Sequence, residues 1–251
     1  KKIFEQKLLT AKAVFGLVQA NTINDDEIEV VTHLENTDTL VEKQDNKKYI
    51  FRTLRQQSKK RQGVPNIALA DFIAPKGTGI QDYIGCFCVT AGFGTSELAA
   101  AYEKNLDDYN AIMIKALSDR LAEAFAEYLH KEVRTKYWGY ANKEQLTNEN
   151  LIEEKYRGIR PAPGYPACPD HTEKLAIWEL LDVQKRIGVK LTESLAMFPA
   201  ASVSGYYFAH PQARYFGLGK ITEDQIIDYA RRKDTELISA RKWLAPNMAE
   251  E

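Results

Sequence analysis

The sequence predicts an α+β fold. Segments rich in β-branched and aromatic residues fill the first third of the chain and recur near its end, and segments with a helical spacing of apolar residues lie between and after them. The two kinds of segment do not alternate regularly, as they would in a doubly wound parallel sheet. A window at residues 158–174, which holds four of the nine prolines of the chain, separates the helical segments.

Four strands are expected before residue 91. Polar, turn-forming segments such as NTINDD and QDNKK separate the apolar runs, which are residues 14–20, 28–34, 48–54 and 83–90. Residues 35–47 are expected to form a long hairpin tip or an inserted loop.

A long amphipathic helix is expected from Ser96 to near Tyr137, with a break around residues 104–108. Asp119, Glu123 and Glu127 form an acidic stripe on it, which is either a solvated face or a surface that meets amide or ammonium donors. Residues 141–157 are expected to hold a short helix. The apolar face of the long helix is predicted from a three- and four-residue spacing of Leu106, Tyr109, Met113, Ala116, Leu117, Leu121, Ala124, Tyr128 and Leu129.

The window GIRPAPGYPACPDHTEK, residues 158–174, is expected to form a stiff, extended ribbon. Proline fixes its own φ, lacks an amide donor and pushes the preceding residue towards extended geometry. Asp170 then suits a helix N-cap, with Glu173 three positions later, and that helix should stop before Gly188.

The last part of the chain is expected to contain a hairpin and two helices. Residues 202–209 and 214–218 read as strands on either side of His210-Pro211-Gln212. Helices are expected from Thr222 onward and over residues 235–244.

Composition excludes several function classes. A net charge of −1 offers no basic field for nucleic acid, and no apolar run approaches the ~20 residues of a membrane span. Three cysteines without a framework argue for a reducing, cytoplasmic location. The start KKIFEQKLLTAKAVF has no signal peptide and no initiator methionine, so we expect a fragment of a longer polypeptide.

Three short motifs have ordinary explanations. Gly92-Phe-Gly94 lacks the third glycine of a dinucleotide loop, so a tight strand-to-helix turn is favoured. Cys86 and Cys88 share one face of a strand without a second ligand pair, so buried hydrophobic positions are favoured over zinc. Cys168 and His171 could form a thiol nucleophile and its base, but Pro169 lies between them and no orienting group can be assigned.

Arg160 is the most suggestive single residue. Its planar guanidinium suits a carboxylate, and the surrounding prolines reduce the entropy lost when a ligand binds. A small zwitterion with an additional positive charge would fit Arg160 together with nearby aromatic faces, which are Tyr165, Tyr206, Tyr207, Tyr215 and Phe216.

The residues 160–169, RPAPGYPACP, resemble a signature of the C-terminal activation domain of cobalamin-dependent methionine synthase. Further segments resemble the same family in order along nearly the whole chain: LADFIAP at 69–75, DYIG at 82–85, DDYN at 107–110, DRLAEAFAEYLH at 119–130, YWGY at 137–140, ASVSG at 201–205, DYA at 228–230 and WLAPN at 243–247.

The resemblance implies a single C-shaped domain over residues 1–251, with a bent antiparallel sheet and flanking helices. It implies binding of S-adenosylmethionine and support for reductive methylation of oxidised cobalamin, as part of methionine synthesis from homocysteine by a methyltransferase. The implied ligand contacts are Arg160, Ala162, Gly164, Tyr165, Tyr215 and Phe216. Asp119 and Glu123 match positions that face cobalamin, and no catalytic or metal-ligating residue is expected in this chain.

The implied partners are a cobalamin-binding domain of the same polypeptide and a flavodoxin or similar reductase. The family has an N-terminal Asp-Trp-x-Pro-Phe-Phe segment whose aspartate also contacts the ligand, and this chain starts after that point. We expect a fragment with no turnover alone, because the resemblance places the cobalamin on another domain. The alternative is an interaction module that caps cobalamin and recruits the reductase through the basic runs at residues 59–61 or 231–233, without holding a ligand. Each basic run, taken by itself, is typical of a solvated surface.

Overall fold

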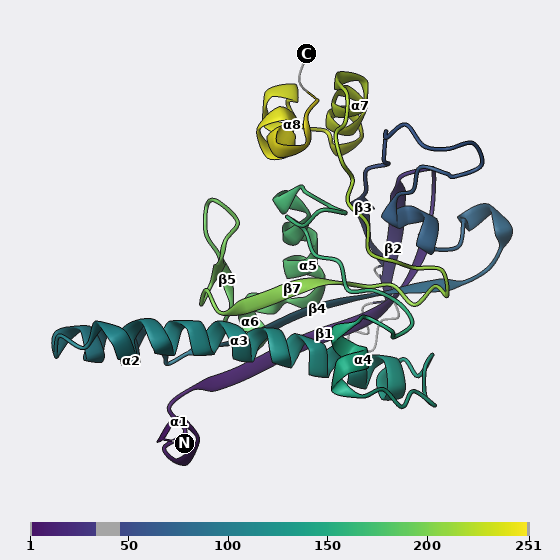
Figure 1. Cartoon of the computed structure of the whole chain (residues 1–251). Coiled ribbons are helices and arrows are strands. Elements are labelled where there is room, and N and C mark those ends of the chain that lie inside the picture. The colour runs from purple at the N-terminus through teal and green to yellow at the C-terminus, as the bar shows by residue number, and fades with distance from the viewer. Residues whose placement is uncertain (1, 34–45, 250–251) are drawn as a thin grey trace, which may run out of the picture. The chain divides into compact units, whose positions relative to one another are not determined.

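A computed structural model of the chain describes residues 2–33 and 46–249. Its main sheet has five strands in the order β3-β2-β1-β4-β7 (Figure 1). Helices accompany the strands, so the predicted α+β class, with an antiparallel sheet and flanking helices, is confirmed. The predicted loop at residues 35–47 lies outside the described residues, apart from its last two, which begin β3. The strands are β1 (Thr10–Thr22), β2 (Glu27–His33), β3 (Asn46–Arg52), β4 (Asp82–Phe93) and β7 (Ser202–Tyr207).

The chain divides into two compact units, and each is made of three separate stretches of sequence. The first unit contains Lys1–Gly16, Cys86–Tyr156 and Ile177–Gly205. The second contains Leu17–Gly85, Arg157–Ala176 and Tyr206–Glu251. The prediction of one domain over residues 1–251 stays a prediction.

A helical hairpin is the main feature of the first unit. It consists of α2 (Thr95–Lys104) and α3 (Asp108–Glu132), which pack against each other. The predicted break is confirmed, because Leu106 has a φ of +57° and Asp107 caps α3 by accepting a hydrogen bond from the Asn110 N–H at 3.1 Å.

The buried face of α3 differs from the predicted one. Its buried residues are Ala111, Ile114, Ser118, Ala122, Ala126, Leu129 and His130. The small side chains let the helix approach closely, and Ala122 packs with Ala91 of β4 and Ala201. Of the predicted apolar face, Leu106 is 91%, Tyr109 71% and Met113 46% exposed. Leu129 of the predicted face is buried, but the rest of that prediction was wrong because it followed the large apolar residues.

A π-helical turn and several short elements complete the first unit. A π-helical turn, Val133–Tyr137, follows α3 and holds the fully buried Arg134, whose Nη2 lies 2.7 Å from Oε1 of Glu144. The other elements are α1 (Lys2–Glu5), α4 (Asn148–Ile152), α6 (Val183–Ile187), β5 (Lys190–Leu191) and β6 (Met197–Phe198). Helix α5 (Lys174–Leu181) begins in the second unit and ends in the first.

Two sequence predictions are confirmed by the end of α6 and by β4. The helix expected after Asp170 ends before Gly188, whose φ is +81° as its left-handed C-terminal position requires. It is not the single helix expected, because Asp182, with a φ of +49°, separates α5 from α6. Cys86 and Cys88 are both 0% exposed on β4, and burial raises the pKa of both thiols, that of Cys88 to about 12.

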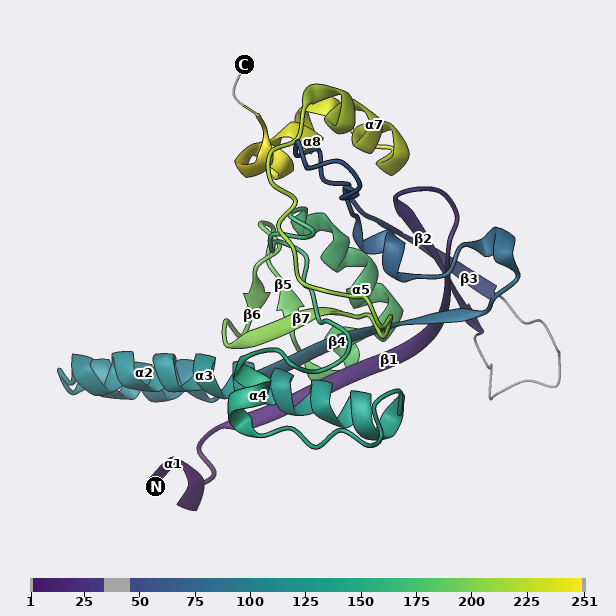
Figure 2. The same cartoon turned by 45° about the vertical axis from the view of Figure 1, so that its right-hand side comes forward.

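The second unit is built around an antiparallel ladder. β1 pairs with β2 from Gln19↔Val31 to Thr22↔Ile28, and β2 pairs with β3 from Glu27↔Arg52 to His33↔Asn46. Two helices, α7 (Glu223–Lys233) and α8 (Leu237–Leu244), lie side by side in both views (Figures 1 and 2). They share an apolar cluster with Leu54, Leu218 and Ile221.

The predicted strand at residues 214–218 is wrong. β7 ends at Tyr207, and residues 214–218 form no strand. Their backbone turns to the proline ribbon instead, since the Leu218 N–H donates to the Pro166 carbonyl at 2.7 Å. Within the described residues, no helix is both long and apolar enough to cross a membrane.

Candidate ligand site on the proline ribbon

The ribbon begins alongside the end of β7. Ile159 and Phe208 exchange two backbone hydrogen bonds of 3.0 Å, and the Tyr206 N–H donates to the Pro161 carbonyl at 2.9 Å. These bonds give the proline-interrupted backbone partners that it could not find in a regular ladder. The ribbon is therefore fixed to the sheet at the point where Arg160 leaves it.

Residues 162–168 then close a small loop. The Gly164 N–H donates to the Cys168 carbonyl at 2.8 Å, the Tyr165 N–H to Ala162 at 3.1 Å, and the Cys168 N–H to Tyr165 at 3.0 Å. Gly164 adopts a φ of +96°, which favours glycine. These hydrogen bonds and the prolines together make the loop rigid, as the proline content predicted. The prediction of an extended backbone is wrong for residues 162–168, which form consecutive turns.

Two main-chain groups of this loop face no protein partner. Within the described part of the chain, neither the Ala162 N–H nor the Gly164 carbonyl takes part in a hydrogen bond. Both residues are partly exposed. The loop thus offers one donor and one acceptor, two residues apart, on a backbone that its other hydrogen bonds hold in place.

Cys168 does not have the environment of a nucleophile. It is 6% exposed, and its thiol donates to the Ala162 carbonyl at 2.9 Å. Burial, with the nearby carboxylates of Glu173 and Asp170, raises its pKa far above neutrality. The thiol therefore stays protonated and serves to hold the loop.

A second segment brings aromatic side chains to the ribbon. The Arg160 N–H donates to the Tyr215 hydroxyl at 3.1 Å, which joins residues 55 positions apart. Phe216 packs against the buried Phe72, with ring centroids 6.4 Å apart. Tyr215 thus contacts the ribbon directly, whereas the printed contact of Phe216 is with Phe72. All six predicted ligand contacts lie in the second unit, namely Arg160, Ala162, Gly164, Tyr165, Tyr215 and Phe216.

A buried ionic cluster, which sequence reasoning missed, fixes the other end of the ribbon. The Lys233 ammonium of α7 lies 2.8 Å from Oδ2 of Asp170 and 2.5 Å from Oε1 of Glu173. The Tyr229 hydroxyl donates to the same Asp170 oxygen at 2.6 Å. Asp170 also caps the next turn by accepting from the Thr172 N–H at 2.7 Å, as its predicted N-cap role requires. We name Asp170, Glu173, Tyr229 and Lys233 the anchor cluster.

Burial and charge act in opposite directions on the two carboxyls of the anchor cluster. Burial alone would raise the pKa of Asp170, but the charge and hydrogen bond of Lys233 and the Tyr229 hydrogen bond hold it below its usual value. Burial raises the pKa of Glu173 in spite of Lys233 and of the Arg52 N–H, which donates to Oε2 at 3.0 Å. The cluster therefore depends on one cation.

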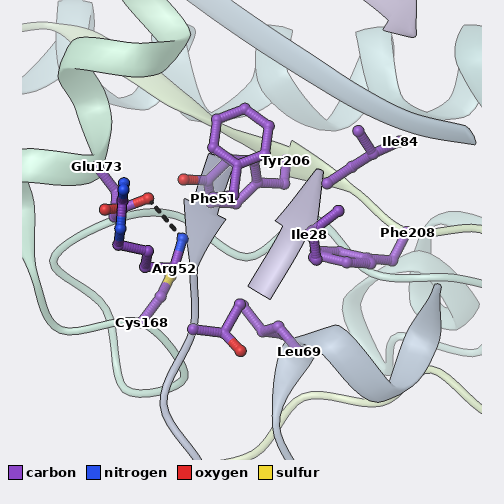
Figure 3. Close-up of a pocket in the computed structure, with 10 residues that line it drawn as sticks. Ile28, Phe51, Arg52, Leu69, Ile84, Cys168, Glu173, Tyr206 and Phe208 are labelled. Carbon is purple, nitrogen blue, oxygen red and sulfur yellow. Dashed lines mark hydrogen bonds between the residues drawn. The ribbon is translucent and has the colours of Figure 1, made fainter. Parts of the chain in front are cut away.

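Figure 3 shows a cavity beside this cluster, where the Glu173 carboxylate faces the Arg52 N–H near Cys168. Its other walls are mainly apolar and include Phe51 and Tyr206. The cavity measures ≈ 10 Å³, about the room of one water molecule. It is too small for an organic ligand, so this cavity is not the ligand site.

Asp119 and Glu123 lie in the first unit, one turn apart on α3, and both are exposed. Glu127, the third member of the predicted acidic stripe, lies instead with Oε1 3.8 Å from Nη1 of the buried Arg134. Two carboxylates of the predicted stripe are therefore exposed, and the third, that of Glu127, lies near the buried Arg134.

Comparison with known families decides what this arrangement represents. A family model described as "Vitamin B12 dependent methionine synthase, activation domain" matches residues 1–234. The chain belongs to this family. The methionine synthase activation domain is part of a methyltransferase that depends on vitamin B12, which confirms the resemblance that residues 160–169 indicated.

A solved structure of the MetH reactivation domain bound to AdoHcy shares the fold of this methionine synthase activation domain. The two chains are 53% identical with a TM-score of 0.90, and the match covers 100% of this chain and 74% of that chain. The ligand of that protein, S-adenosylhomocysteine, is what S-adenosylmethionine becomes when it gives up its methyl group.

Proposed function

We propose that this chain binds S-adenosylmethionine on the proline ribbon and supports the reductive methylation of oxidised cobalamin carried on a neighbouring domain. The observation that carries the proposal is the rigid loop of residues 162–168, which leaves the Ala162 N–H and the Gly164 carbonyl available. A preorganised donor and acceptor bind an amino-acid group with little loss of entropy. The AdoHcy-bound relative supports the ligand class.

Arg160 is proposed to bind the ligand carboxylate. Its backbone is fixed by Tyr215 and its side chain is partly exposed at the start of the loop. Tyr165 is 58% and Tyr215 37% exposed, so their rings can face a sulfonium cation. Phe216, packed on Phe72, would contribute an apolar wall.

In the proposed reaction a reductase supplies one electron to oxidised cobalamin, and the sulfonium methyl is transferred to the reduced cobalt, leaving S-adenosylhomocysteine. The positive sulfonium and the reduced cobalt carry opposite charges, which are neutralised when the methyl group is transferred. Exclusion of water from the site therefore does not oppose this step. The ribbon would act by orientation, which can lower a barrier by ~7–11 kcal/mol. No general acid or base is required of the protein.

The partner domain is proposed to meet α3. Asp119 and Glu123 are exposed there, and the same helix exposes Tyr109, Ile112 and Met113. Exposed apolar side chains beside charged ones are typical of a surface that another protein covers. We therefore assign Asp119 and Glu123 to the face that covers cobalamin, and we expect no turnover from the chain without a cobalamin domain.

The test is calorimetric titration of S-adenosylmethionine into wild-type protein and the Arg160→Ala variant. Loss of a charged hydrogen bond of ~1.5–3 kcal/mol should weaken binding about ten- to a hundredfold. Arg157→Ala is the matched control, because this exposed arginine lies three residues earlier and uses Nε to donate to the Ala209 carbonyl. Equal affinity of wild type and Arg160→Ala would contradict the assignment.

The second candidate is a module that recruits an acidic reductase without binding a ligand. Exposed Lys59 and Arg61 favour it, whereas Lys233 of the other basic run is committed to the anchor cluster. The titration separates the two functions, since this candidate predicts no heat of binding with S-adenosylmethionine or S-adenosylhomocysteine. It also predicts that Lys59→Glu weakens reductase binding.

A further inference from the structure

The ring of His171 lies directly against Gly164. A Cβ atom built on Gly164 would collide with three ring atoms of His171, namely Cε1, Nδ1 and Nε2. The ring therefore fills the space on one side of the turn that presents the Gly164 carbonyl. Neither the sequence nor the function proposed above gives His171 a role at this turn.

Groups from two further elements also contact the ring. The Lys174 Nζ lies 3.0 Å from Nδ1 of His171, and the Trp243 ring of α8 lies 6.0 Å away between centroids. An ammonium has no lone pair, so Lys174 donates and Nδ1 accepts, which places the proton of the neutral ring on Nε2. The His171 ring therefore contacts Lys174, Trp243 and the turn at Gly164.

The charges around the ring favour its neutral form. Partial burial and the Lys174 charge lower the pKa of His171, and Asp170 opposes them. Asp170 is itself paired with Lys233 of α7, and Lys242 of α8 lies over the Trp243 ring at 5.8 Å. A proton on Nδ1 would remove the acceptor that Lys174 uses and place two cations 3.0 Å apart.

We propose that His171 is a positioning residue for the ribbon's ligand: its neutral ring, held by Lys174, props the Gly164 turn in the shape that offers the Ala162 N–H and the Gly164 carbonyl. This inference rests on the proposed binding of S-adenosylmethionine. It adds a residue that touches no ligand and acts through the turn, and it makes ligand affinity depend on the protonation of one histidine.

The first test is the pH dependence of S-adenosylhomocysteine binding, measured by calorimetry between about pH 4.5 and 8.5. Wild-type affinity should be constant in the upper half of this range and fall at the lower end by at least about fivefold, the smallest typical coupling. His171→Asn keeps an acceptor near the Nδ1 position without titrating, so its affinity should change less with pH. His171→Ala should bind more weakly at every pH.

His33→Asn is the matched control, since His33 lies at the end of β2 and should leave the wild-type pH profile unchanged. If His171→Asn keeps the wild-type profile, another group such as Glu173 titrates and the proposal is wrong. Wild-type affinity that does not change with pH would also overturn it.

The second test needs no ligand, so it separates failure of this inference from failure of the proposed function. The amide resonance of Gly164 in a proton–nitrogen correlation spectrum should move with the titration of the His171 ring, and this movement should vanish in His171→Asn. A Gly164 resonance that ignores the His171 titration would refute the positioning role, whether or not S-adenosylhomocysteine binds.

Discussion

Gly164 must be glycine for two independent reasons. Its φ of +96° lies in the left-handed region, and the His171 ring occupies the place of a side chain. Gly79 shares the first reason only, because its φ is +71° but no heavy atom lies within 4 Å of the place that a Cβ would take. The two glycines therefore allow backbone strain and side-chain collision to be measured separately.

Gly164→Ala should lower the free energy of unfolding by about 2–4 kcal/mol, as left-handed strain adds to overpacking against His171. Gly79→Ala should cost about 1–2 kcal/mol, from the backbone alone. Urea unfolding of both variants measures the difference. Adding His171→Ala to Gly164→Ala should restore part of the loss, and equal losses at the two glycines would contradict the collision.

Residue-scale prediction from the sequence succeeded where chemistry is local. The stiffness that the prolines confer and the N-cap at Asp170 are readable within the window itself, whereas the ligand contact of Arg160 stays a prediction. The roles of Lys233 and His171 are not, because Lys233 contacts residues some 60 positions earlier and the His171 ring is placed by folding. A basic run that reads as solvated surface can thus contain a buried partner.

At the scale of elements, α7 holds the ribbon by its last turn. Lys233 is 16% exposed at its side chain, and Asp170 and Glu173 are each 5% exposed. Arg231, in the same basic run, is 79% exposed and pairs with Asp228 on the helix surface. One helix therefore offers a buried and an exposed cation for comparison.

Lys233→Met should destabilise the fold by ~3–5 kcal/mol at neutral pH, because two buried carboxylates lose their counter-ion. Arg231→Met should cost no more than ~1 kcal/mol. Urea unfolding of both variants, compared with wild type, provides the measurement. Similar losses in the two variants would show that Lys233 does not act as a buried counter-ion.

The pH dependence of this loss has a definite sign. In wild type, the lowered pKa of Asp170 contributes stability above its unfolded pKa of ~3.9, which is lost as pH falls through the folded value. Without Lys233 both carboxyls should have folded pKa values above their unfolded ones. Protonation of the two carboxyls then stabilises the folded variant at low pH. The loss of unfolding free energy in Lys233→Met, relative to wild type, should therefore be smaller at about pH 5 than at about pH 8.

Element prediction failed where two interpretations of one pattern competed. Helix α3 carries a row of large apolar residues and a row of alanines, and the alanine row is the buried one because close packing against β4 favours small side chains. Residues 214–218 have the composition of a strand, yet they form none. Their Leu218 N–H donates instead to the Pro166 carbonyl of the ribbon. Tertiary context decided both cases.

At the scale of the whole molecule, Asp119 and Glu123 belong to one compact unit and the ribbon to the other. Asp119→Asn with Glu123→Gln should therefore leave the affinity for S-adenosylhomocysteine within about twofold. In the intact methionine synthase, the recovery of activity after oxidation should slow about tenfold if the pair contributes ~1.4 kcal/mol to the covering of cobalamin.

The check is a reactivation assay with S-adenosylmethionine and a reductant, run beside a Glu103→Gln control on the exposed surface of α2. Normal recovery in the double variant would remove these two residues from the cobalamin face.

The overall family was readable from residues 160–169, but the division of the chain into interleaved units was not, since contacts between distant stretches define it.

The interleaving carries a genetic consequence. The stretch Tyr206–Glu251 supplies Tyr215, Phe216 and Lys233 to the unit that contains the ribbon. A premature stop codon shortly after Gly205 would leave the whole signature motif in the translated product and yet deprive it of its supports. Truncation alleles that retain the motif should therefore behave as nulls, and neither unit can be cloned as one uninterrupted reading frame.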